Sequence, residues 1–293
     1  MMIRIATRAS DLALWQANTV ARLLTGSGNA VEVCRVSTRG DRETDSPLAE
    51  IGGQGLFTAE IDRALAEGEA DVAVHSLKDL PVEPAPGFRL SAVLERGPVE
   101  DVLVSAGNVP LERLPPGARV GTSSPRRAAY LAETRGDLEL VDLRGNVPTR
   151  VGRVTGGDLH ATILARAGVV RLGLDVTPGE ILGPPDWLPA PGQGAVAVVT
   201  RSDDAAVHEQ VSALDHAPTR RAVDAERAVL AGIGGGCSLP LGTFARPVDG
   251  GWELRATLFV NGRSRLDEVR RGDDPSALAR DIAAAFVAGG AAS

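Results

Sequence analysis

The chain has 293 residues, of which 43% are hydrophobic and 24% are charged, and this balance is typical of a globular protein with two or three domains. Its net charge of −7 argues against general nucleic-acid binding, which depends on a basic surface. No apolar run reaches the ~20 residues that span a bilayer and the N-terminus has no signal-peptide core, so we expect a cytoplasmic protein without membrane contact.

Strand-like and helix-like segments alternate over residues 1–96. Three apolar segments are predicted to be strands: 3–8, 31–38 and 70–76. Ser10 is placed to cap a helix over residues 11–24, and a second helix is predicted over residues 57–67. The βαβαβ order predicts a parallel sheet with helices on both faces. We expect residues 195–214 to return to this domain.

A second α/β domain is predicted over residues 97–194. Its expected strands are 118–124, 138–145 and 160–165. Ser124 is a candidate N-cap, and Pro125 is favoured at the first position of the helix that follows. Further helices are expected from about Val147 and around Ala167.

A change of pattern near Ala217 marks a small α+β domain over residues 215–293. A helix to Leu230 is followed by a glycine-rich turn and by three segments that alternate like antiparallel strands: 242–248, 251–260 and 263–271. An amphipathic helix over residues 274–287 completes the domain. The expected fold class is therefore α/β, with two doubly wound domains and a small α+β C-terminal domain.

Hydroxyl and arginine side chains gather at the first strand–helix turn of each α/β domain. They are Thr7, Arg8 and Ser10 in the first domain, and Thr122, Ser123, Ser124, Arg126 and Arg127 in the second. Helix N-termini bind anions, and a guanidinium group matches a carboxylate. Arg144, Arg150 and Arg171 follow other predicted strands of the second domain. A single arginine there is ordinarily a solvated surface residue, but several at the ligand-binding edge of one sheet indicate a ligand with several negative groups.

The segment HSLKDLP, residues 75–81, ends an apolar strand with ionisable groups. Asp79 has two readings: a solvated residue at an ordinary strand exit, or a carboxylate that does acid–base or cation-stabilising work at the mouth of a cleft. The only lysine of the chain, Lys78, precedes it, although lysine and arginine together number 31. His75 is interpreted as structural.

Cys237 follows three glycines in the segment GIGGGCSLP. The glycines permit close approach of another group and indicate an exposed, aimed sulfur. Cys34 falls on a predicted strand and is interpreted as a small buried side chain. Neither cysteine belongs to a CxxC pair and the four histidines lack metal-ligand spacing, so we expect no disulfide framework and no metal site. A nucleophilic thiol remains open on motif chemistry, although no histidine lies in an obvious partner segment.

Taken together, these segments resemble the porphobilinogen deaminase (hydroxymethylbilane synthase) family. The match follows order and spacing along the chain: IRIATRAS, ALWQA, STRGD, GGQGLF, DVAVHSLKDLP, VGTSSPRR, LRGNVPTR, ILARAGVVRLGL, LPAPGQGA, AERA and GGGC. The stretch beyond Gly242 matches least. The resemblance implies two sheet domains like those of type II solute-binding proteins and a third α+β domain.

The resemblance also implies an enzyme of tetrapyrrole (heme) biosynthesis that condenses four porphobilinogen molecules to linear hydroxymethylbilane and releases ammonia at each addition. It implies a dipyrromethane cofactor attached by a thioether to Cys237. Asp79 would hydrogen-bond pyrrole nitrogens and stabilise the cationic azafulvene that forms when ammonia leaves. By match to the family, the cofactor-binding residues would be Lys78, Thr122, Ser123, Ser124, Arg126 and Arg127. The substrate-binding residues would be Arg8, Ser10, Arg144, Arg150, Arg171 and Gln193.

Two segments depart from the family's pattern. In the loop that covers the cleft in this family, Glu50 and Gln54 stand at positions where lysines are common. A cationic role for this loop is therefore not expected, and Glu50 should weakly oppose an anionic substrate. A DPRD-like stretch is common at residues 97–101, and its arginine is missing here. The main rival interpretation is a non-catalytic solute-binding or ligand-sensing protein of the same fold. No segment suggests an obligate apolar interface, so a monomer is expected.

Overall fold

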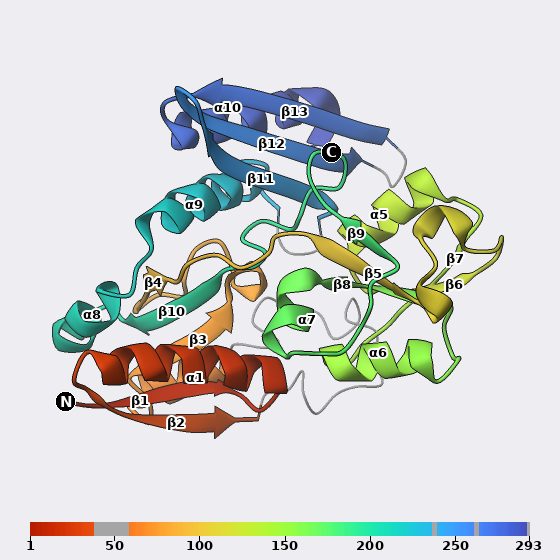
Figure 1. The fold of residues 1–293 in the computed structure, drawn as a ribbon. Helices are drawn as coiled ribbons and strands as arrows, with labels where there is room; N and C mark the ends of the chain where they lie inside the picture. Colours follow the sequence, from red (N-terminus) through yellow and green to blue (C-terminus); the bar gives the residue numbers. More distant parts are fainter. Residues whose placement is uncertain (38–58, 236–238, 261–263, 292–293) are drawn as a thin grey trace. The chain divides into compact units, whose positions relative to one another are not determined.

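The computed structural model describes the chain except residues 38–58, 236–238, 261–263 and 292–293 (Figure 1). Glu50 and Gln54 of the predicted covering loop, and the predicted attachment residue Cys237, lie outside the described residues. The chain divides into two units: Met1–Gly97 with Gly194–Arg220, and Pro98–Gln193 with Arg221–Ser293. The division into three domains stays a prediction.

A five-stranded sheet forms the centre of the first unit, in the order β2-β1-β3-β10-β4. Its strands are β1 (Met2–Arg8), β2 (Ala30–Val36), β3 (Val72–Ser76), β4 (Phe88–Val93) and β10 (Val196–Arg201). β1 pairs in parallel with both β2 and β3, as the βαβαβ pattern predicts. β10, which comes from the segment expected to return to this domain, lies between β3 and β4.

The parallel prediction concerns β1, β2 and β3 and says nothing of β10, which runs antiparallel to both of its neighbours and makes the sheet mixed. Val196, at the start of β10, pairs with Ser76, at the end of β3. The chain therefore enters β10 at the edge where β3 leaves the sheet, and a strand that enters there must run in the opposite direction. β4 has no counterpart among the predicted strands.

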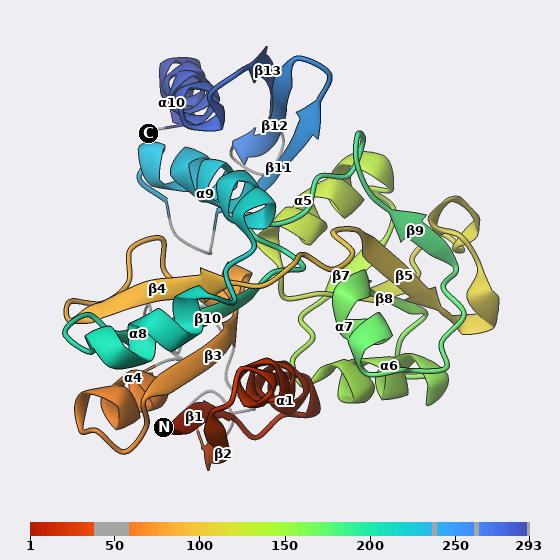
Figure 2. The same cartoon turned by 60° about the vertical axis from the view of Figure 1, so that its left-hand side comes forward.

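Helices cover both faces of this sheet (Figure 2). They are α1 (Asp11–Gly26), α4 (Ala59–Ala66) and α8 (Ala205–Ser212). α1 and α8 bury their apolar side chains on the face that carries Ile5 and Val74. α4 packs on the opposite face, against Ala6 and Ala73. Ser10 caps α1, as predicted.

The second unit contains another five-stranded sheet, in the order β7-β6-β8-β5-β9. Its strands are β5 (Asp101–Ser105), β6 (Arg119–Gly121), β7 (Glu139–Val141), β8 (Ala161–Ala165) and β9 (Glu180–Leu182). β6 pairs in parallel with β7 and β8, whereas β5 runs antiparallel to β8 and β9. β5 and β9 have no counterpart among the predicted strands.

Three helices flank this second sheet: α5 (Pro125–Thr134), α6 (Val147–Thr155) and α7 (Arg166–Arg171). α5 packs on one face with Tyr130 and Leu131, while α6 and α7 cover the other face. The predicted N-cap Ser124 is confirmed, because its side chain accepts a hydrogen bond from the Arg127 amide.

The C-terminal part of the second unit is a three-stranded antiparallel sheet with two helices on one face. Its elements are α9 (Ala217–Gly232), β11 (Leu241–Val248), β12 (Gly251–Val260), β13 (Ser264–Gly272) and α10 (Pro275–Phe286). On β12, Phe259 contacts the Tyr130 ring edge-on, with 4.9 Å between the centroids. The predicted fold class, with two α/β parts and a small α+β part, is confirmed.

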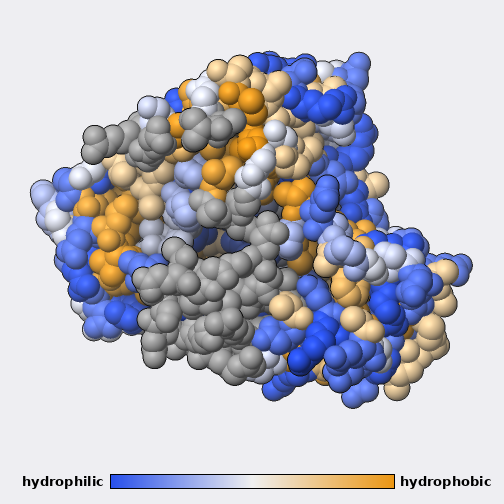
Figure 3. Space-filling model, turned by 180° about the vertical axis from the view of Figure 1, so that it is seen from behind, coloured by the Kyte–Doolittle hydropathy of each residue, from blue (hydrophilic) through white to orange (hydrophobic). Residues whose placement is uncertain are grey.

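Large apolar side chains are exposed at separate elements of the described chain. Figure 3 shows hydrophilic residues over much of the visible surface, with apolar patches between them. The exposed apolar side chains include Trp15, Val170, Ile181 and Val269. Over the described residues, no helix combines the length and the apolar character that crossing a membrane requires.

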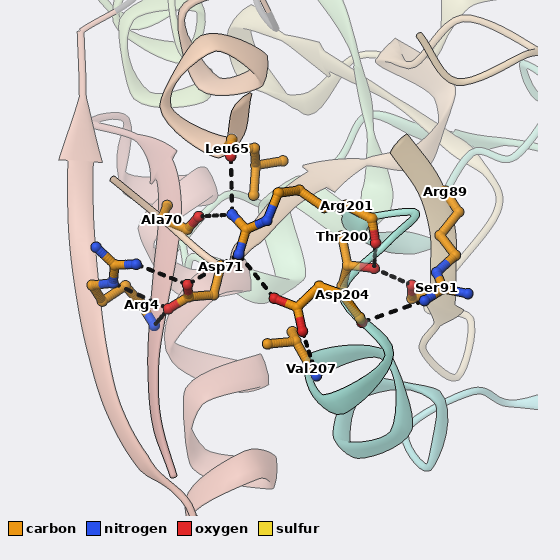
Figure 4. A network of polar contacts seen from close by, with 10 residues as sticks. All are labelled: Arg4, Leu65, Ala70, Asp71, Arg89, Ser91, Thr200, Arg201, Asp204 and Val207. Atoms are coloured by element: carbon orange, nitrogen blue, oxygen red, sulfur yellow. Dashed lines mark hydrogen bonds and ion pairs between the residues drawn. The ribbon is translucent and has the colours of Figure 1, made fainter. Parts of the chain in front are cut away.

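An ion-pair network secures the amino-terminal edge of β3 (Figure 4). Asp71 accepts two hydrogen bonds from the Arg4 guanidinium, at 2.8 and 3.1 Å, and one from the Arg4 amide at 2.9 Å. Arg201 donates to the same carboxylate at 3.3 Å and to Asp204 at 2.9 Å. The network joins β1, β3 and β10 at one edge of the sheet, and Asp79 follows the opposite end of β3.

Replacing Asp71 with asparagine is expected to lower the free energy of unfolding at pH 7 by about 1–3 kcal/mol, because it weakens the charge-assisted bonds from Arg4 and Arg201. Burial opposes the ionisation of Asp71, but the hydrogen bonds from Arg4 outweigh it and hold its pKa below the ordinary value. Such a carboxylate stabilises the fold above its unfolded-state pKa of about 3.9, and the contribution is lost as the pH falls through the folded-state pKa. Urea unfolding across this range should show a difference between the two proteins that shrinks in acid; a constant difference would contradict the prediction.

Candidate active site

A pocket in the first unit opens at the carboxyl ends of β1 and β3. Its lining residues are Arg8, Ser10, Leu12, Ala13, Gln16, Val74, His75, Ser76 and Asp79. The parallel register pairs Ala6 with Ala73, so the turns that follow the two strands meet at one edge of the sheet. Ligands of open α/β sheets bind at this edge. The structure thus brings together three residues that the sequence singles out: Arg8, Ser10 and Asp79.

Asp79 ends a single 3₁₀ turn, Leu77–Asp79, that follows β3 directly. Leu77 is fully buried, and its amide donates a hydrogen bond to the Ala195 carbonyl at 3.0 Å. This anchor leaves Lys78 half-buried and Asp79 exposed. The Asp79 carboxylate is therefore accessible at the pocket, where it can accept hydrogen bonds from N–H groups and stabilise a positive charge.

The turn after β1 is held by two hydroxyl groups. Thr7 is fully buried, and its hydroxyl donates to the Ala13 carbonyl at 3.2 Å. The Ser10 hydroxyl accepts from the Ala13 amide at 3.4 Å as the N-cap of α1. Thr7 and Ser10 therefore fix the path of the backbone on both sides of Arg8, whose half-buried side chain lines the pocket.

Two further polar residues, Gln16 and Ser76, line the pocket and are not among the residues predicted from the sequence. The Gln16 side chain is 1% exposed and donates to the Ser76 hydroxyl at 2.8 Å. The feature of the sequence that could have identified Gln16 is its place on the apolar face of α1, where it belongs to the same buried stripe as Ala17 and Val20. A polar residue on a buried helix face needs a polar partner, and here the partner lies in the pocket wall.

His75 is buried next to the same pocket, as the structural interpretation expects. Burial and, as the smaller cause, the charge of Arg8 together lower the pKa of His75 to about 4. The imidazole is therefore neutral at neutral pH. Its Nε2 atom has no hydrogen-bond partner among the described residues.

Cys34 is half-buried on β2, so the expectation of a buried cysteine is only partly right. The reason is that, among the described strands, β2 lies at the edge of its sheet and pairs with β1 alone. Burial nevertheless raises the pKa of the Cys34 thiol, which disfavours the reactive thiolate.

In the second unit, the turn between β6 and α5 carries three predicted ligand-binding hydroxyls. The Thr122 hydroxyl accepts from the Ser124 amide at 3.2 Å. The Ser123 hydroxyl donates to the Leu143 carbonyl at 2.6 Å and accepts from the Leu143 amide at 3.2 Å. Ser123 thereby ties this turn to the segment after β7, which carries Arg144 next in the chain. The two turns meet at the carboxyl edge of the second sheet, since Gly121 pairs with Val141.

Arg126 and Arg127 are buried, with 3% and 6% of their surface exposed, and both form ion pairs with Asp101. Arg126 also donates to the Leu188 carbonyl at 2.8 Å, and Arg127 to the Ile163 carbonyl at 2.9 Å. The sequence predicts these arginines as ligand-binding groups, and the structure gives them protein partners. Their role toward a cofactor stays a prediction.

The remaining predicted residues of the second unit differ in exposure. Arg144, Arg150 and Arg171 are half-buried, and the Arg150 Nε donates to the Gly145 carbonyl at 2.8 Å. Burial lowers the pKa of Arg171, which indicates a guanidinium partly withdrawn from water. Gln193 is fully buried and donates to the Val99 carbonyl at 2.7 Å, so its amide supports the protein interior.

No cluster of three potential metal ligands (His, Cys, Asp or Glu) occurs in the part of the chain that the structure describes. The polar groups at the carboxyl edge of each sheet are guanidinium and hydroxyl groups, which donate hydrogen bonds, and carboxylates, which accept them. This donor set suits an organic ligand that carries carboxylates and N–H groups.

Comparison with known families gives two matches that together cover most of the chain. Residues 3–209 match the family model "Porphobilinogen deaminase, dipyromethane cofactor binding domain". Residues 221–288 match the model "Porphobilinogen deaminase, C-terminal domain".

Among solved structures, the chain is similar to the methionine-binding protein MetQ, with 12% identity, a TM-score of 0.47 and coverage of 78% of this chain and 93% of that chain. It is similar in the same way to the substrate-binding protein of a methionine transporter from Streptococcus pneumoniae, with 15% identity, a TM-score of 0.47 and coverage of 77% and 92%.

Curated relatives are much closer in sequence. A porphobilinogen deaminase of Xanthomonas axonopodis pv. citri is 48% identical over 99% of this chain and 97% of its own length. Another, of Xanthomonas campestris pv. campestris, is 51% identical over 89% of this chain and 84% of its own length. A third, of Nitratidesulfovibrio vulgaris, is 45% identical over 98% of this chain and 94% of its own length. The resemblance found in the sequence motifs is thereby confirmed, and the chain belongs to the porphobilinogen deaminase family.

Proposed function

We propose that this chain is a porphobilinogen deaminase, a transferase that condenses four porphobilinogen molecules to hydroxymethylbilane in tetrapyrrole (heme) biosynthesis. The observation that carries the proposal is the pocket of the first unit, where the exposed carboxylate of Asp79 stands with Arg8 and Ser10 at the joined ends of β1 and β3. An anionic ligand with N–H donors suits this combination of a guanidinium, a hydroxyl and a carboxylate.

The reaction places a positive charge next to Asp79. The amino group of the aminomethyl side chain of porphobilinogen leaves from its protonated form: the bond between the methylene carbon and the ammonium nitrogen breaks, neutral ammonia departs, and the positive charge passes to the pyrrole ring. A free pyrrole carbon then attacks the methylene carbon, and a proton leaves as the carbon–carbon bond forms. A carboxylate that is preorganised by the anchored turn stabilises this charge more strongly in the transition state than in the ground state.

Dipyrromethane is the proposed cofactor, attached through Cys237, and when bound it supplies the pyrrole carbon to which the first substrate ring is joined. Its rings carry carboxylates, and the buried arginines of the second unit fit such a group, because the Nε atoms of Arg126 and Arg127 have no hydrogen-bond partner in the described chain. The proposed cofactor-binding residues are Lys78, Thr122, Ser123, Ser124, Arg126 and Arg127.

Each added ring brings an acetate and a propionate, so the growing chain accumulates negative charge. The proposed substrate-binding residues are Arg8, Ser10, Arg144, Arg150, Arg171 and Gln193. The arginines supply the counter-charges. Gln193 is fully buried, so its contribution would be indirect, through its hydrogen bonds to other residues of the protein. We further propose that the enzyme works as a cytoplasmic monomer with porphobilinogen as its small-molecule partner.

The alternative function is that of a non-catalytic solute-binding protein. The intact mass of the purified chain and the turnover of porphobilinogen distinguish it from the enzyme. The enzyme should consume porphobilinogen with release of ammonia and of hydroxymethylbilane. Intact-mass spectrometry of the purified chain should give a mass above that of the sequence by two linked pyrroles. A folded chain without added mass that binds porphobilinogen reversibly and does not consume it would support the solute-binding alternative instead.

A further inference from the structure

A fully buried carboxylate, Asp101, lies at the centre of a hydrogen-bond cluster in the second unit. Its Oδ2 atom accepts from Arg126 at 2.8 Å and from the Trp187 indole N–H at 2.9 Å. Its Oδ1 atom accepts from Arg127 at 2.7 Å and from the Gln193 amide at 2.9 Å. Both oxygens of the carboxylate are thus engaged by two donors each.

The cluster sits at the carboxyl edge of the second sheet. Asp101 is the first residue of β5 and pairs with Ala165, the last residue of the antiparallel strand β8. β6 is parallel to β8, and β7 is parallel to β6, so both strands end at the same edge as β8. Asp101 therefore starts its strand where the segments that carry Thr122 and Arg144 leave theirs.

The charges of the cluster do not cancel. Two guanidinium groups surround one carboxylate, so one positive charge is in excess. Burial raises the pKa of Asp101, but the charges of Arg126 and Arg127 outweigh it and hold the pKa well below the ordinary value, so the group is ionised throughout the neutral range. The Nε atoms of both arginines are buried and have no hydrogen-bond partner among the described residues. An excess charge and unused donors in a buried place favour a further carboxylate.

We propose that Asp101 is a positioning residue of the cofactor site. It fixes the guanidinium groups of Arg126 and Arg127 and neutralises one of their two charges, so that the remaining positive charge matches one carboxylate of the ligand. The inference rests on the proposed function. Without the Asp101 charge, the repulsion between the two guanidinium groups is no longer offset, and the charge-assisted hydrogen bonds that orient them are weakened. The neutral donors Trp187 and Gln193 complete the shell without adding charge.

Replacing Asp101 with asparagine tests this inference, and Asp71→Asn is the matched control. Both substitutions neutralise a carboxylate held by two arginines, but Asp71 belongs to the amino-terminal edge of the other sheet. Both variants should melt at a lower temperature than the parent protein. The fraction of molecules that carries two linked pyrroles, measured by intact mass, should fall about tenfold or more in Asp101→Asn, as expected for the loss of charge-assisted bonds, and stay unchanged in Asp71→Asn. Equal loading of the two variants would overturn the inference.

A second measurement needs no variant of Asp101 and applies even if Asp101→Asn does not fold. The Trp187 indole N–H reports on the cluster, and its ¹H–¹⁵N signal can be assigned by its loss in Trp187→Phe. The signal should shift between the loaded parent protein and unloaded Cys237→Ala, because a bound carboxylate polarises the hydrogen bonds of Asp101. An unchanged signal would overturn the inference. If the parent protein itself carries no added mass and consumes no porphobilinogen, the proposed function fails; if it is loaded and the cluster does not respond, only the role of Asp101 fails.

Discussion

Replacing Asp79 with alanine is expected to abolish turnover while the fold stays intact. Asp79 is exposed and ends a turn that is anchored by the buried Leu77, so its side chain contributes little to packing. Its proposed partner is the positive charge that reaches the pyrrole ring only as ammonia leaves, so the loss should appear in kcat rather than in KM. A decrease of about 10²-fold or more is expected, as for other preorganised groups that stabilise a developing charge. Porphobilinogen consumption and thermal unfolding measure the two properties.

Glu83→Ala is the matched control for this prediction. Glu83 is another exposed acidic residue close by in the chain, and it is not part of the pocket lining. Its replacement should leave kcat unchanged, which separates the position of Asp79 from a general loss of negative charge. Near-normal consumption of porphobilinogen by Asp79→Ala would remove the proposed role of this carboxylate.

Local sequence signals predict those elements of the fold that depend on local interactions. Ser10 and Ser124 are predicted as N-caps, and both cap helices in the structure, because capping involves only a few neighbouring residues. β5 is different. Its residues Asp101–Ser105 are all buried and show no alternation of apolar and polar side chains, and the strand is defined by its pairing with β8 and β9. Such pairing is not visible in a short segment of sequence.

The residues of the candidate site differ in the same way: some positions follow from the predicted topology, and others depend on contacts between distant segments. Arg8, Ser10 and Asp79 follow predicted strands, and parallel strands bring their carboxyl ends to one edge, so their proximity in the pocket follows from the predicted topology. The burial of Arg126 and Arg127 does not follow from it. Their partner Asp101 lies 25 and 26 residues away on the strand β5, which the sequence does not reveal. An arginine at the start of a helix can therefore bind a ligand or form an ion pair within the protein, and only the tertiary structure distinguishes the two.

Replacing Cys237 with alanine is expected to remove both the added mass of two linked pyrroles and all synthesis of hydroxymethylbilane. The proposed thioether needs the Cys237 sulfur, and alanine offers no atom that could form the bond. The expected loss of turnover is complete, because the first substrate ring then has no attached pyrrole to extend. Intact-mass spectrometry and product formation from porphobilinogen measure the two effects in one preparation.

The second cysteine makes this experiment specific. Cys34 lies half-buried on the edge strand β2, and burial raises the pKa of its thiol, so attachment there is chemically disfavoured. Cys34→Ala should therefore keep the full added mass and normal turnover. Added mass that persists in Cys237→Ala, or that disappears in Cys34→Ala, would place the attachment elsewhere. Since the chain has two cysteines, the pair of variants decides which sulfur carries the cofactor.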